Sequence, residues 1–413
     1  MIFNIKVKHD LNDTEQILKS IMYNIKESDI PEEVVKEYGF NSELNIYRNK
    51  IDKIDPDVWK KIRWYINNFD FLVKDPIINR AFYKYWEIVN TFEIFNNYNT
   101  SDLIFHCAEA PGGFIQGSNI LLQLDNYKEC VKINKSVIDD DGFMEVKKKK
   151  KQQKKYKIYT ISLNKDLLKY RNYNLPSYNK RIINNNVCIL YGKDNTGDIN
   201  NLDNVHYIKN LINDGFFLIT ADGGFDEGND FNNKEQLHYY LILNEIYSAI
   251  YLQKQGGNFI LKVFDIFTKT SINLFYLLSL LYENVFIYKP KTSRPTNSEK
   301  YIICKNFKCS TEILNHVLLV LENLSQKLKY QKYKYSSFTL FDTISPEFLN
   351  NICNVNTTLV NNQCKFLKIA IDLCDDKEFI KNYDNELNNS LEKRKKIFKQ
   401  WESKYGLCDF IPF

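Results

Sequence analysis

Glycine and proline are scarce in this chain of 413 residues, which contains 14 glycines and 9 prolines. Collagen-like and low-complexity chains need far more of both, so the composition indicates an ordered globular protein. Hydrophobic residues make up 44% of the sequence, which is enough for a sizeable core. The length is compatible with one large domain or with about two to three smaller ones.

Metal-binding patterns are missing as well. The nine cysteines form no Cys-x-x-Cys pair, and the five histidines have no ligand spacing with them. We therefore expect no metal, and reduced thiols in an intracellular compartment. The sequence also has no long apolar run: its most apolar stretch, INLFYLLSLLY at 272–282, is too short to span a bilayer. No signal-peptide pattern opens the chain, and we expect a soluble protein without a membrane partner.

Charge of either sign is nearly balanced, with 56 Lys and Arg against 51 Asp and Glu, a net charge of +5. This mild basic excess permits an anionic partner such as nucleic acid but does not require one. The one low-complexity segment is a lysine-rich run, KKKKKQQKKYK at 147–157. A solvated insertion loop is the plain interpretation of this run, and attraction of phosphates is the alternative.

The pattern of apolar residues divides the chain into three parts. Residues 1–75 predict a helical module, residues 76–310 alternate strand-like runs with amphipathic helices, and residues 311–413 predict helices again. The alternation in the central part indicates βαβ units and a parallel sheet with helices on both faces. A Gly-Gly pair at 256–257 is expected to end one of these helices. The seven expected strands are residues 102–107, 156–163, 186–192, 216–222, 258–265, 285–290 and 300–307.

A turn rich in small residues follows the first expected strand, in HCAEAPGGFIQG at 106–117. In an open parallel sheet, ligands bind beyond the carboxyl ends of the strands, where a strand turns into its helix. Glycine lets a ligand approach the backbone, and the N–H groups at the start of the helix attract a negative group. Taken alone, plain turn chemistry explains the turn at least as well as a binding site does.

Four further blocks accompany this turn: RAFYKYWEI (80–88), LITADGGFD (218–226), FILKVFD (259–265) and KPKTSRPTNSEKYIICKNF (289–307). In order and spacing, the five blocks resemble those of FtsJ-like ribose 2'-O-methyltransferases, which include the cap-1 and cap-2 enzymes of eukaryotes and large DNA viruses. The resemblance covers residues 76–310. It implies a Rossmann-like seven-stranded sheet that binds S-adenosylmethionine.

The resemblance also implies a catalytic tetrad of Lys, Asp, Lys and Glu. Lys84 stands at the place of the first Lys, Asp222 at that of the Asp, Lys262 at that of the second Lys and Glu299 at that of the Glu. A ribose 2'-OH is a weak acid, so its methylation needs a base or a field that favours the alkoxide. Two neighbouring lysines lower each other's pKa, and we expect Lys262 to accept the proton while Asp222 orients it.

Cofactor contacts are expected from the turn and from two other places. Ala110, Pro111, Gly112, Gly113 and Phe114 would form the floor of the site, and Asp222 would face the sulfonium. Asp198, in YGKDNTGDI (191–199), would accept a hydrogen bond from the adenine amine, with the capping of a turn as the alternative.

Two positions depart from the family pattern. His106 stands where many members have Asp, which brings HCAEAPGG closer to the Adrift-type cap-2 branch and its viral relatives. Glu109 is a candidate replacement for the missing acid, and His106 fits a packed strand residue equally well. Asn164 and Lys165 stand where a ribose-binding acid is often found, and Asp166 is the nearest carboxylate.

The expected function is transfer of a methyl group from S-adenosylmethionine to a ribose 2'-OH in the 5' cap region of mRNA. The partners would be capped RNA and the capping or transcription machinery, in the cytoplasm (a viral factory or virion for a virus) or in the nucleus. Two alternatives stay open: methylation of ribosomal or transfer RNA, and a catalytically silent RNA-binding scaffold that kept the fold. The extensions on both sides of the central part favour the cap-type enzyme.

Overall fold

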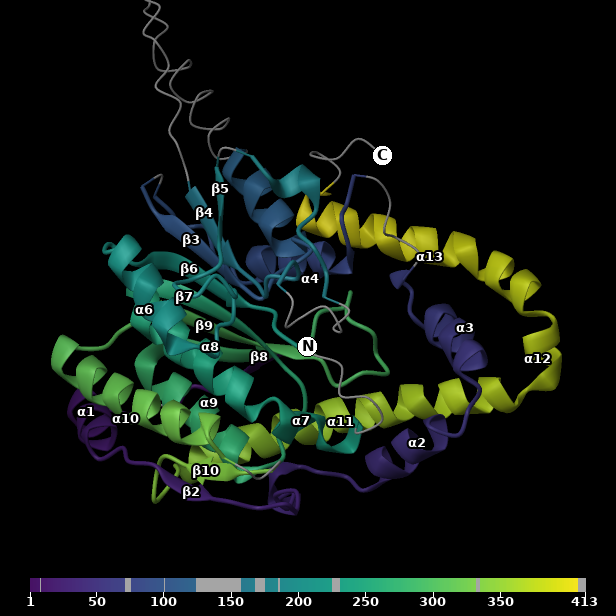
Figure 1. The fold of residues 1–413 in the computed structure, drawn as a ribbon. Helices are drawn as coiled ribbons and strands as arrows, with labels where there is room; N and C mark the ends of the chain where they lie inside the picture. Colours follow the sequence, from purple (N-terminus) through teal and green to yellow (C-terminus); the bar gives the residue numbers. More distant parts are fainter. Residues whose placement is uncertain are drawn as a thin grey trace, which may run out of the picture.

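The computed structural model describes residues 1–7, 9–70, 76–99, 101–123, 157–167, 175–184, 186–224, 231–331 and 335–407. Within these ranges the chain forms a mixed sheet of eight strands, with helices on both sides (Figure 1). In spatial order the strands are β1 (Ile2–Asn4), β8 (Tyr282–Tyr288), β9 (Lys300–Phe307), β7 (Gln253–Val263), β6 (Phe216–Ala221), β3 (Leu103–Cys107), β4 (Lys157–Ile161) and β5 (Val187–Leu190).

The strand order reverses at β3, and this fixes where a ligand can bind. From β3 the chain continues to β4 and β5 on one side, and then returns to β6 and β7 on the other; all of these neighbours are parallel. Strands β9, β8 and β1 are added antiparallel beyond β7. The crevice of such a sheet lies outside the carboxyl ends of the strands at the reversal, here β3 and β6.

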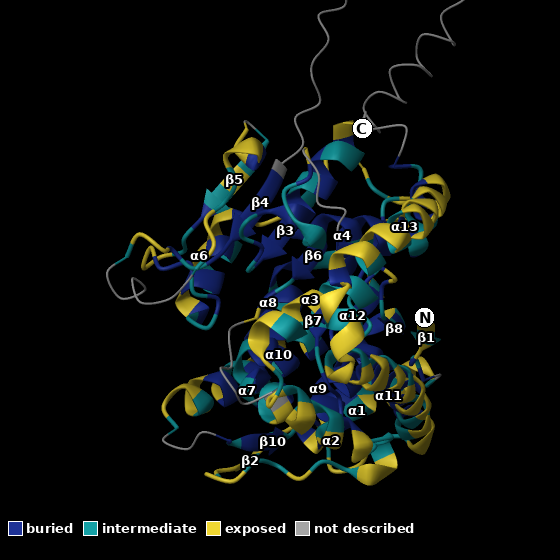
Figure 2. Cartoon of the chain, turned by 90° about the vertical axis from the view of Figure 1, so that its right-hand side faces the viewer, coloured by how far each residue is buried: buried dark blue, intermediate teal, exposed yellow. Residues whose placement is uncertain are grey.

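Alternation along the strands builds two cores. Ile104, Leu218 and Ile260 pack on one face of the sheet, while Phe105 and Ile219 pack on the other. The first face is covered by α4 (Arg80–Thr91) and by a helix over residues 113–123. The second face is covered by α1 (Leu11–Lys19), α6 (Leu202–Leu211), α8 (Tyr239–Leu252), α9 (Lys269–Leu281) and α10 (Thr311–Lys329). Figure 2 shows the strands as the buried centre of the molecule.

The N-terminal segment is more closely joined to the sheet than expected. The prediction of a purely helical N-terminus is wrong for residues 2–4, because β1 pairs with β8 at the sheet edge. Ile5 and Val7, just after β1, are buried in the same core as the central strands. Short elements follow: β2 (Asn24–Lys26), which pairs with β10 (Ser337–Thr339), η1 (Lys36–Tyr38), α2 (Glu43–Ile51) and α3 (Pro56–Ile66). The domain limits at 75 and 310 stay a prediction.

The seven expected strands are all present among the described residues, with shifted ends. The Gly-Gly pair does not end a helix: α8 stops at Leu252, and Gly256 and Gly257 lie inside β7. The register between β6 and β7 shifts just there, and Gly256 has a φ of +75°, which only glycine adopts freely. The lysine run at 147–155 lies outside the described residues. Short helical turns complete the central part: η4 (Lys180–Ile182), η5 (Phe231–Asn233) and α7 (Lys234–Leu237).

The C-terminal part is helical, as predicted, and returns to the sheet. After α10 it forms α11 (Pro346–Asp375), α12 (Lys377–Lys381) and α13 (Tyr383–Tyr405). Figure 1 shows these helices as an arc that leads away from the sheet along α2 and α3 and comes back beside α4. Trp401 and Tyr405 of α13 pack in a cluster with Phe82 and Trp86 of α4. The last helix is therefore seated on the helix that carries Lys84.

Candidate active site

Two ion pairs bring together the four residues expected to form the tetrad. Lys84 Nζ lies 2.7 and 2.8 Å from the two carboxylate oxygens of Glu299, and Lys262 Nζ lies 3.4 Å from Asp222 Oδ1. The Lys262 ammonium also donates to the backbone carbonyl of Asp222 at 2.6 Å. All four side chains are only 11–15% exposed, so water screens their charges poorly. The charge of Lys262 lowers the pKa of Glu299, which places the two pairs within electrostatic reach.

Glycine makes the position of Lys84 possible. Asn79 caps the start of α4, and its side chain accepts a hydrogen bond from Ala81 N. A Cβ on Gly113 would lie 2.2 Å from Asn79 Oδ1 and 2.7 Å from Phe82 N. Only a residue without a side chain lets the first turn of α4 lie this close to the loop after β3. Gly113 is therefore needed for helix packing, whatever the loop binds.

Strand register places the second pair. Asp222 follows β6 directly, and Lys262 lies in β7 next to Tyr301 of β9. The Tyr301 hydroxyl donates to Asp222 Oδ1 at 3.1 Å, which orients the carboxylate. The apolar residues around Lys262 in FILKVFD favour a strand, and the sequence prediction used this signal. The contribution of Tyr301 was missed, since it depends on the antiparallel pairing of β9.

The electrostatics of Lys262 differ from the sequence-based expectation. We expected a lowered pKa from the proximity of a second lysine. Burial does lower the pKa of the Lys262 amine, but the charge of Asp222 and of other carboxylates raises it by more, so the net shift is upward. The other carboxylates belong to Glu109, Glu245 and Glu299. Lys84, the other lysine of the tetrad, is paired with Glu299. Without a ligand, Lys262 is an ammonium group.

Glu299 is held as a carboxylate by its neighbours. Burial would raise its pKa, but the charges of Lys84 and Lys262 lower it to about 2. Ser293 Oγ adds a hydrogen bond to Glu299 Oε1 at 2.9 Å. Lys289 Nζ donates to the backbone carbonyls of Asn297 and Glu299, both at 2.8 Å. The amine of Lys289 thus joins the two ends of the loop from 289 to 299. Burial lowers the pKa of this amine to about 7.

Glu109 lies in the loop after β3, and only one of its two carboxyl oxygens has a hydrogen-bond partner among the described residues. Its Oε1 accepts from Phe114 N at 2.7 Å, in the first turn of the next helix. Its Oε2 is buried and has no hydrogen-bond partner in the described parts of the chain. Burial, reinforced by the charge of Asp222, raises the pKa of Glu109 well above its usual value. A ligand that brings a positive charge or a donor to Oε2 would satisfy this oxygen.

The other residues of this loop are shaped by packing. Gly112 has a φ of +113°, and a Cβ there would lie 2.6 Å from Ile182 Cδ1. Glycine is therefore required at position 112 by the backbone conformation and by the close approach of Ile182. Ala110 N donates a hydrogen bond to Ser162 Oγ at 3.1 Å, which connects the loop to the end of β4. The sequence predictions for this loop did not include these contacts.

Three residues that the sequence left open now have visible contacts. His106 is buried between Thr220 Oγ1 at 2.7 Å and Ser118 Oγ at 3.1 Å, and burial lowers its pKa to about 3. It is a packed strand residue, as the alternative interpretation held. Asp198 accepts from Asn200 N at 2.9 Å, the turn-capping contact that was its alternative role. Asn164 Nδ2 donates to a backbone carbonyl of the neighbouring loop, that of residue 195, at 3.1 Å.

Glu245 of α8 is a buried carboxyl group that the sequence analysis missed. It lies against Gly223, where a Cβ would be 2.2 Å from Glu245 Oε1. Burial raises the pKa of Glu245 to about 8, while the charge of Lys262 opposes the shift. A signal for it existed, because Glu245 is the only charged residue in the helix YYLILNEIYSAIYL. An isolated carboxylate in an apolar helix indicates a buried, specific partner.

Glu87 joins the site to the C-terminal helix. From α4, one turn beyond Lys84, it accepts hydrogen bonds from Tyr288 Oη at 2.6 Å, Lys291 N at 2.7 Å and both the N and Oγ1 of Thr292 at 3.2 and 3.0 Å. A further bond comes from Trp401 Nε1 of α13 at 3.0 Å. One buried carboxylate therefore fixes α4, the start of the loop that leads to Glu299, and α13.

Within the described ranges, no three His, Cys, Asp or Glu residues gather as metal ligands. The described helices include none that combines the length and the apolar character needed to cross a membrane.

Comparison with known proteins gives consistent similarities. Residues 77–307 match the sequence model of FtsJ-like methyltransferases. The chain is 34% identical over 158 residues to cap-specific mRNA (nucleoside-2'-O-)-methyltransferase 1 of Danio rerio, which covers 37% of this chain and 18% of the relative. It is 25% identical over 385 residues to the protein of the same name from Dictyostelium discoideum, which covers 89% of this chain and 47% of the relative.

In each of these comparisons the matched part spans less than half of the curated relative. Among solved structures, a putative ribosomal RNA methyltransferase from Plasmodium falciparum is 20% identical, covering 55% of this chain and 97% of that one, with a TM-score of 0.36. The family match covers more than half of the chain, includes all four tetrad positions and coincides with the sheet built around them. This chain belongs to the FtsJ-like methyltransferase family.

Proposed function

We propose that this protein methylates the ribose 2'-OH of RNA in the 5' cap region of mRNA, with Lys84, Asp222, Lys262 and Glu299 as its catalytic residues. The observation that carries the proposal is the pair of buried ion pairs at the carboxyl ends of the central strands. The similarity to cap-specific mRNA methyltransferases supports the choice of RNA class. Components of the capping or transcription machinery are the partners that such a substrate implies.

S-adenosylmethionine is the methyl donor of FtsJ-like methyltransferases, and the crevice fits a ligand of its charge. Four acidic side chains lie within electrostatic reach of Lys262, and Glu109 Oε2 lacks a partner among the described residues. A ligand with an ammonium and a sulfonium group supplies positive charge to such a site. Glu109, Asp222 and the loop residues 110–114 would hold it, together with Asp198. When bound, it supplies a methyl group on a positively charged sulfur.

The chemistry of the hydroxyl falls to Lys262. A positive ligand in the crevice would offset the carboxylates that raise the pKa of Lys262, so the ammonium group would lose its own proton more easily. The neutral amine would then accept the proton of the hydroxyl as the hydroxyl oxygen takes up the methyl group. Asp222, itself held by Tyr301, keeps the amine in place. Lys84 and Glu299 form the opposite wall and fix the position of the ribose.

Transfer of a labelled methyl group to defined RNAs tests this function. The substrates are a capped RNA, the same RNA without a cap, and capped RNAs with 2'-deoxyribose at the first or the second nucleotide. We expect label only in capped RNA, and loss of label when the target nucleotide lacks its 2'-OH. Equal labelling of uncapped RNA would favour ribosomal or transfer RNA as substrate. Binding of RNA and cofactor without any transfer would identify a silent scaffold.

A further inference from the structure

Helix α13 carries a concentration of positive charge on the side that faces away from α4. Residues 393–404 of this helix contain six basic residues and one acid, while its first ten residues, 383–392, contain three acids and no basic residue. Four exposed lysines form what we call the lysine face: Lys395, Lys396, Lys399 and Lys404. Helix-dipole effects favour cations only in the last turn, so they explain Lys404 but not the other three.

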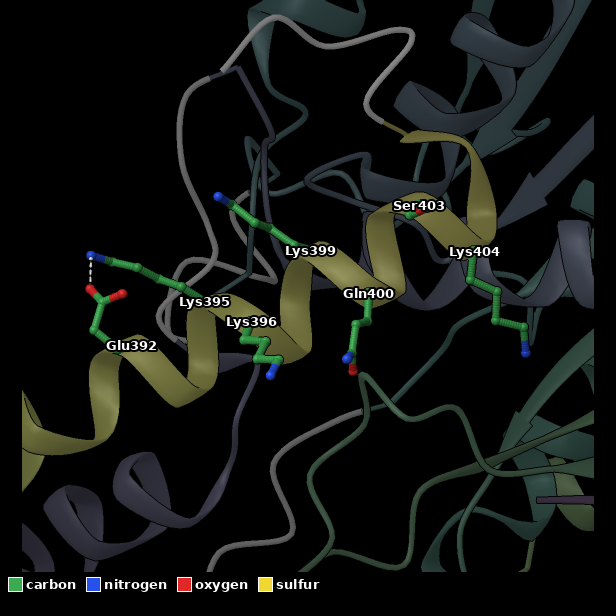
Figure 3. A pocket seen from close by; sticks show the side chains of 7 residues that line it. All are labelled: Glu392, Lys395, Lys396, Lys399, Gln400, Ser403 and Lys404. Carbon is green, nitrogen blue, oxygen red and sulfur yellow. Dashed lines mark hydrogen bonds and ion pairs between the residues drawn. The ribbon is translucent and has the colours of Figure 1, made fainter.

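The lysine face lines an open pocket with a volume of about 710 Å³ (Figure 3). Lys396, Gln400 and Lys404 project to one side of the helix, and Lys395 and Lys399 to the other. Glu392 pairs with Lys395 at 2.8 Å, whereas no ion pair holds Lys396 or Lys399 among the described residues. Neutral polar groups, Gln400 and Ser403, lie between the lysines. Phosphate oxygens are bound by this combination of ammonium and neutral donors.

The opposite side of α13 is fixed to the candidate active site. Phe398 and Trp401 pack against Tyr83, with ring centroids 5.9 and 5.8 Å apart, and Tyr83 directly precedes Lys84 in α4. Trp401 also donates to Glu87. Lys399 is adjacent in sequence to Phe398, so the lysine face stands at a fixed place beside the catalytic helix. A surface that guides a polymeric substrate needs such a rigid relation to the reacting groups.

We propose that the lysine face of α13 binds the phosphate backbone of the RNA strand that enters the site; this rests on the proposed function. Exposed lysines attract phosphates without reading bases, so the contact is independent of sequence and weakens with salt. The site is separate from the tetrad and lies outside the matched family region, which ends at residue 307.

The test compares two double variants of equal charge change. Lys396→Glu with Lys399→Glu alters the lysine face, and Lys327→Glu with Lys329→Glu alters α10, which covers the other face of the sheet. Affinity for a fluorescent single-stranded RNA is measured at several salt concentrations, with cofactor affinity and unfolding as controls. We expect the α13 variant to bind RNA on the order of tenfold more weakly. A Lys396→Ala, Lys399→Ala variant should lower the salt slope by about 1.4, or about 0.7 for each lost contact.

Equal RNA affinity in the two glutamate variants would overturn the proposal, whether both bind well or both bind poorly. Methylation by the unmodified protein is measured in parallel and separates the two hypotheses. If RNA is methylated but the α13 variant binds it normally, the surface is wrong and the function stands. If the α13 variant alone loses RNA binding while no RNA is methylated, the surface stands and the function is wrong.

Discussion

Lys262 lies among more negative than positive charge, and its behaviour follows from that environment. The sequence contains two lysines and two acidic residues at the spacing typical of the family, and the structure brings these four residues together. The sequence does not show how the charges pair: Lys84 lies against Glu299, and Lys262 lies against Asp222. Pairing depends on which strand ends meet, which residue types along one strand do not reveal.

Replacement of Lys262 by alanine tests its assigned role. We expect methyl transfer to fall by on the order of 100-fold or more, since a positioned proton-transfer group is lost. Cofactor affinity should change little, because the amine faces the hydroxyl. Single-turnover rates and calorimetric titration measure the two effects, with Lys327→Ala on α10 as the control. A rate above a tenth of the unmodified protein would remove Lys262 from the mechanism.

Glu245 makes stability depend on pH. Its pKa is about 8 in the folded protein and near 4.5 when unfolded, so the folded state holds an extra proton between these values. Stability from this group is complete below pH 4.5 and is lost as pH rises through 8. The Glu245→Gln variant lacks this pH dependence. As pH rises through this window, the free energy of unfolding of the unmodified protein should therefore fall relative to that of the variant, by up to about 1.4 kcal/mol per pH unit. Urea unfolding from pH 5 to 9 measures it; parallel curves would contradict the assignment.

Helix α13 acts on the site as a clamp. The sequence predicted its helical pattern well, because a 3.6-residue period is a local signal. The position of α13 against α4 could not be predicted, because Trp401 and Tyr405 contact residues that lie more than 300 positions earlier in the chain. The added strand β1 was missed for the same reason, since a three-residue strand is defined by its partner and not by its own pattern.

Substitution of Trp401 by phenylalanine isolates one bond of this clamp. The ring is kept, but Glu87 loses the N–H donor at 3.0 Å. A hydrogen bond to a charged group contributes about 1.5–3 kcal/mol, so we expect a loss of stability of this size. The turnover rate should fall while cofactor affinity stays the same, because Glu87 positions α4. Unfolding curves and kinetic constants for Trp401→Phe and for Phe398→Leu separate the bond from packing. Equal effects in the two variants would argue against a specific role of Glu87.

At the scale of the whole molecule, both extensions are built into the central part. The core around the sheet includes Ile5 and Val7 from the N-terminal segment and Ile352 and Val355 from α11. The helical character of the C-terminal region was predicted, whereas the strand at residues 2–4 was not. The sequence could not tell whether the outer regions fold separately, because a hydrophobic stripe shows that a face is covered but not by what.

Ile5→Ala tests whether the N-terminal segment folds as one unit with the sheet. Ile5 is fully buried, and removal of its side chain should cost about 2–5 kcal/mol. If the core is shared, unfolding followed by tryptophan fluorescence and by circular dichroism shifts as a single transition to lower urea. A shift confined to one probe, with the main transition unchanged, would instead support an independent module ending near residue 75.

The hydrogen bond between Trp401 and Glu87 spans 314 positions of the chain. During translation α4, which carries Glu87 and Lys84, therefore leaves the ribosome long before Trp401 does. The nascent chain contains Lys84, and later the entire region matched to the family, before the residues of α13 that pack against α4 have been synthesised. Domains fold from the N-terminus during synthesis, but here the packing of α4 is completed only after α13 has been synthesised. A ribosome that stalls before codon 401 releases a chain that contains all four proposed catalytic residues and lacks the tryptophan that binds Glu87 in the same helix as Lys84.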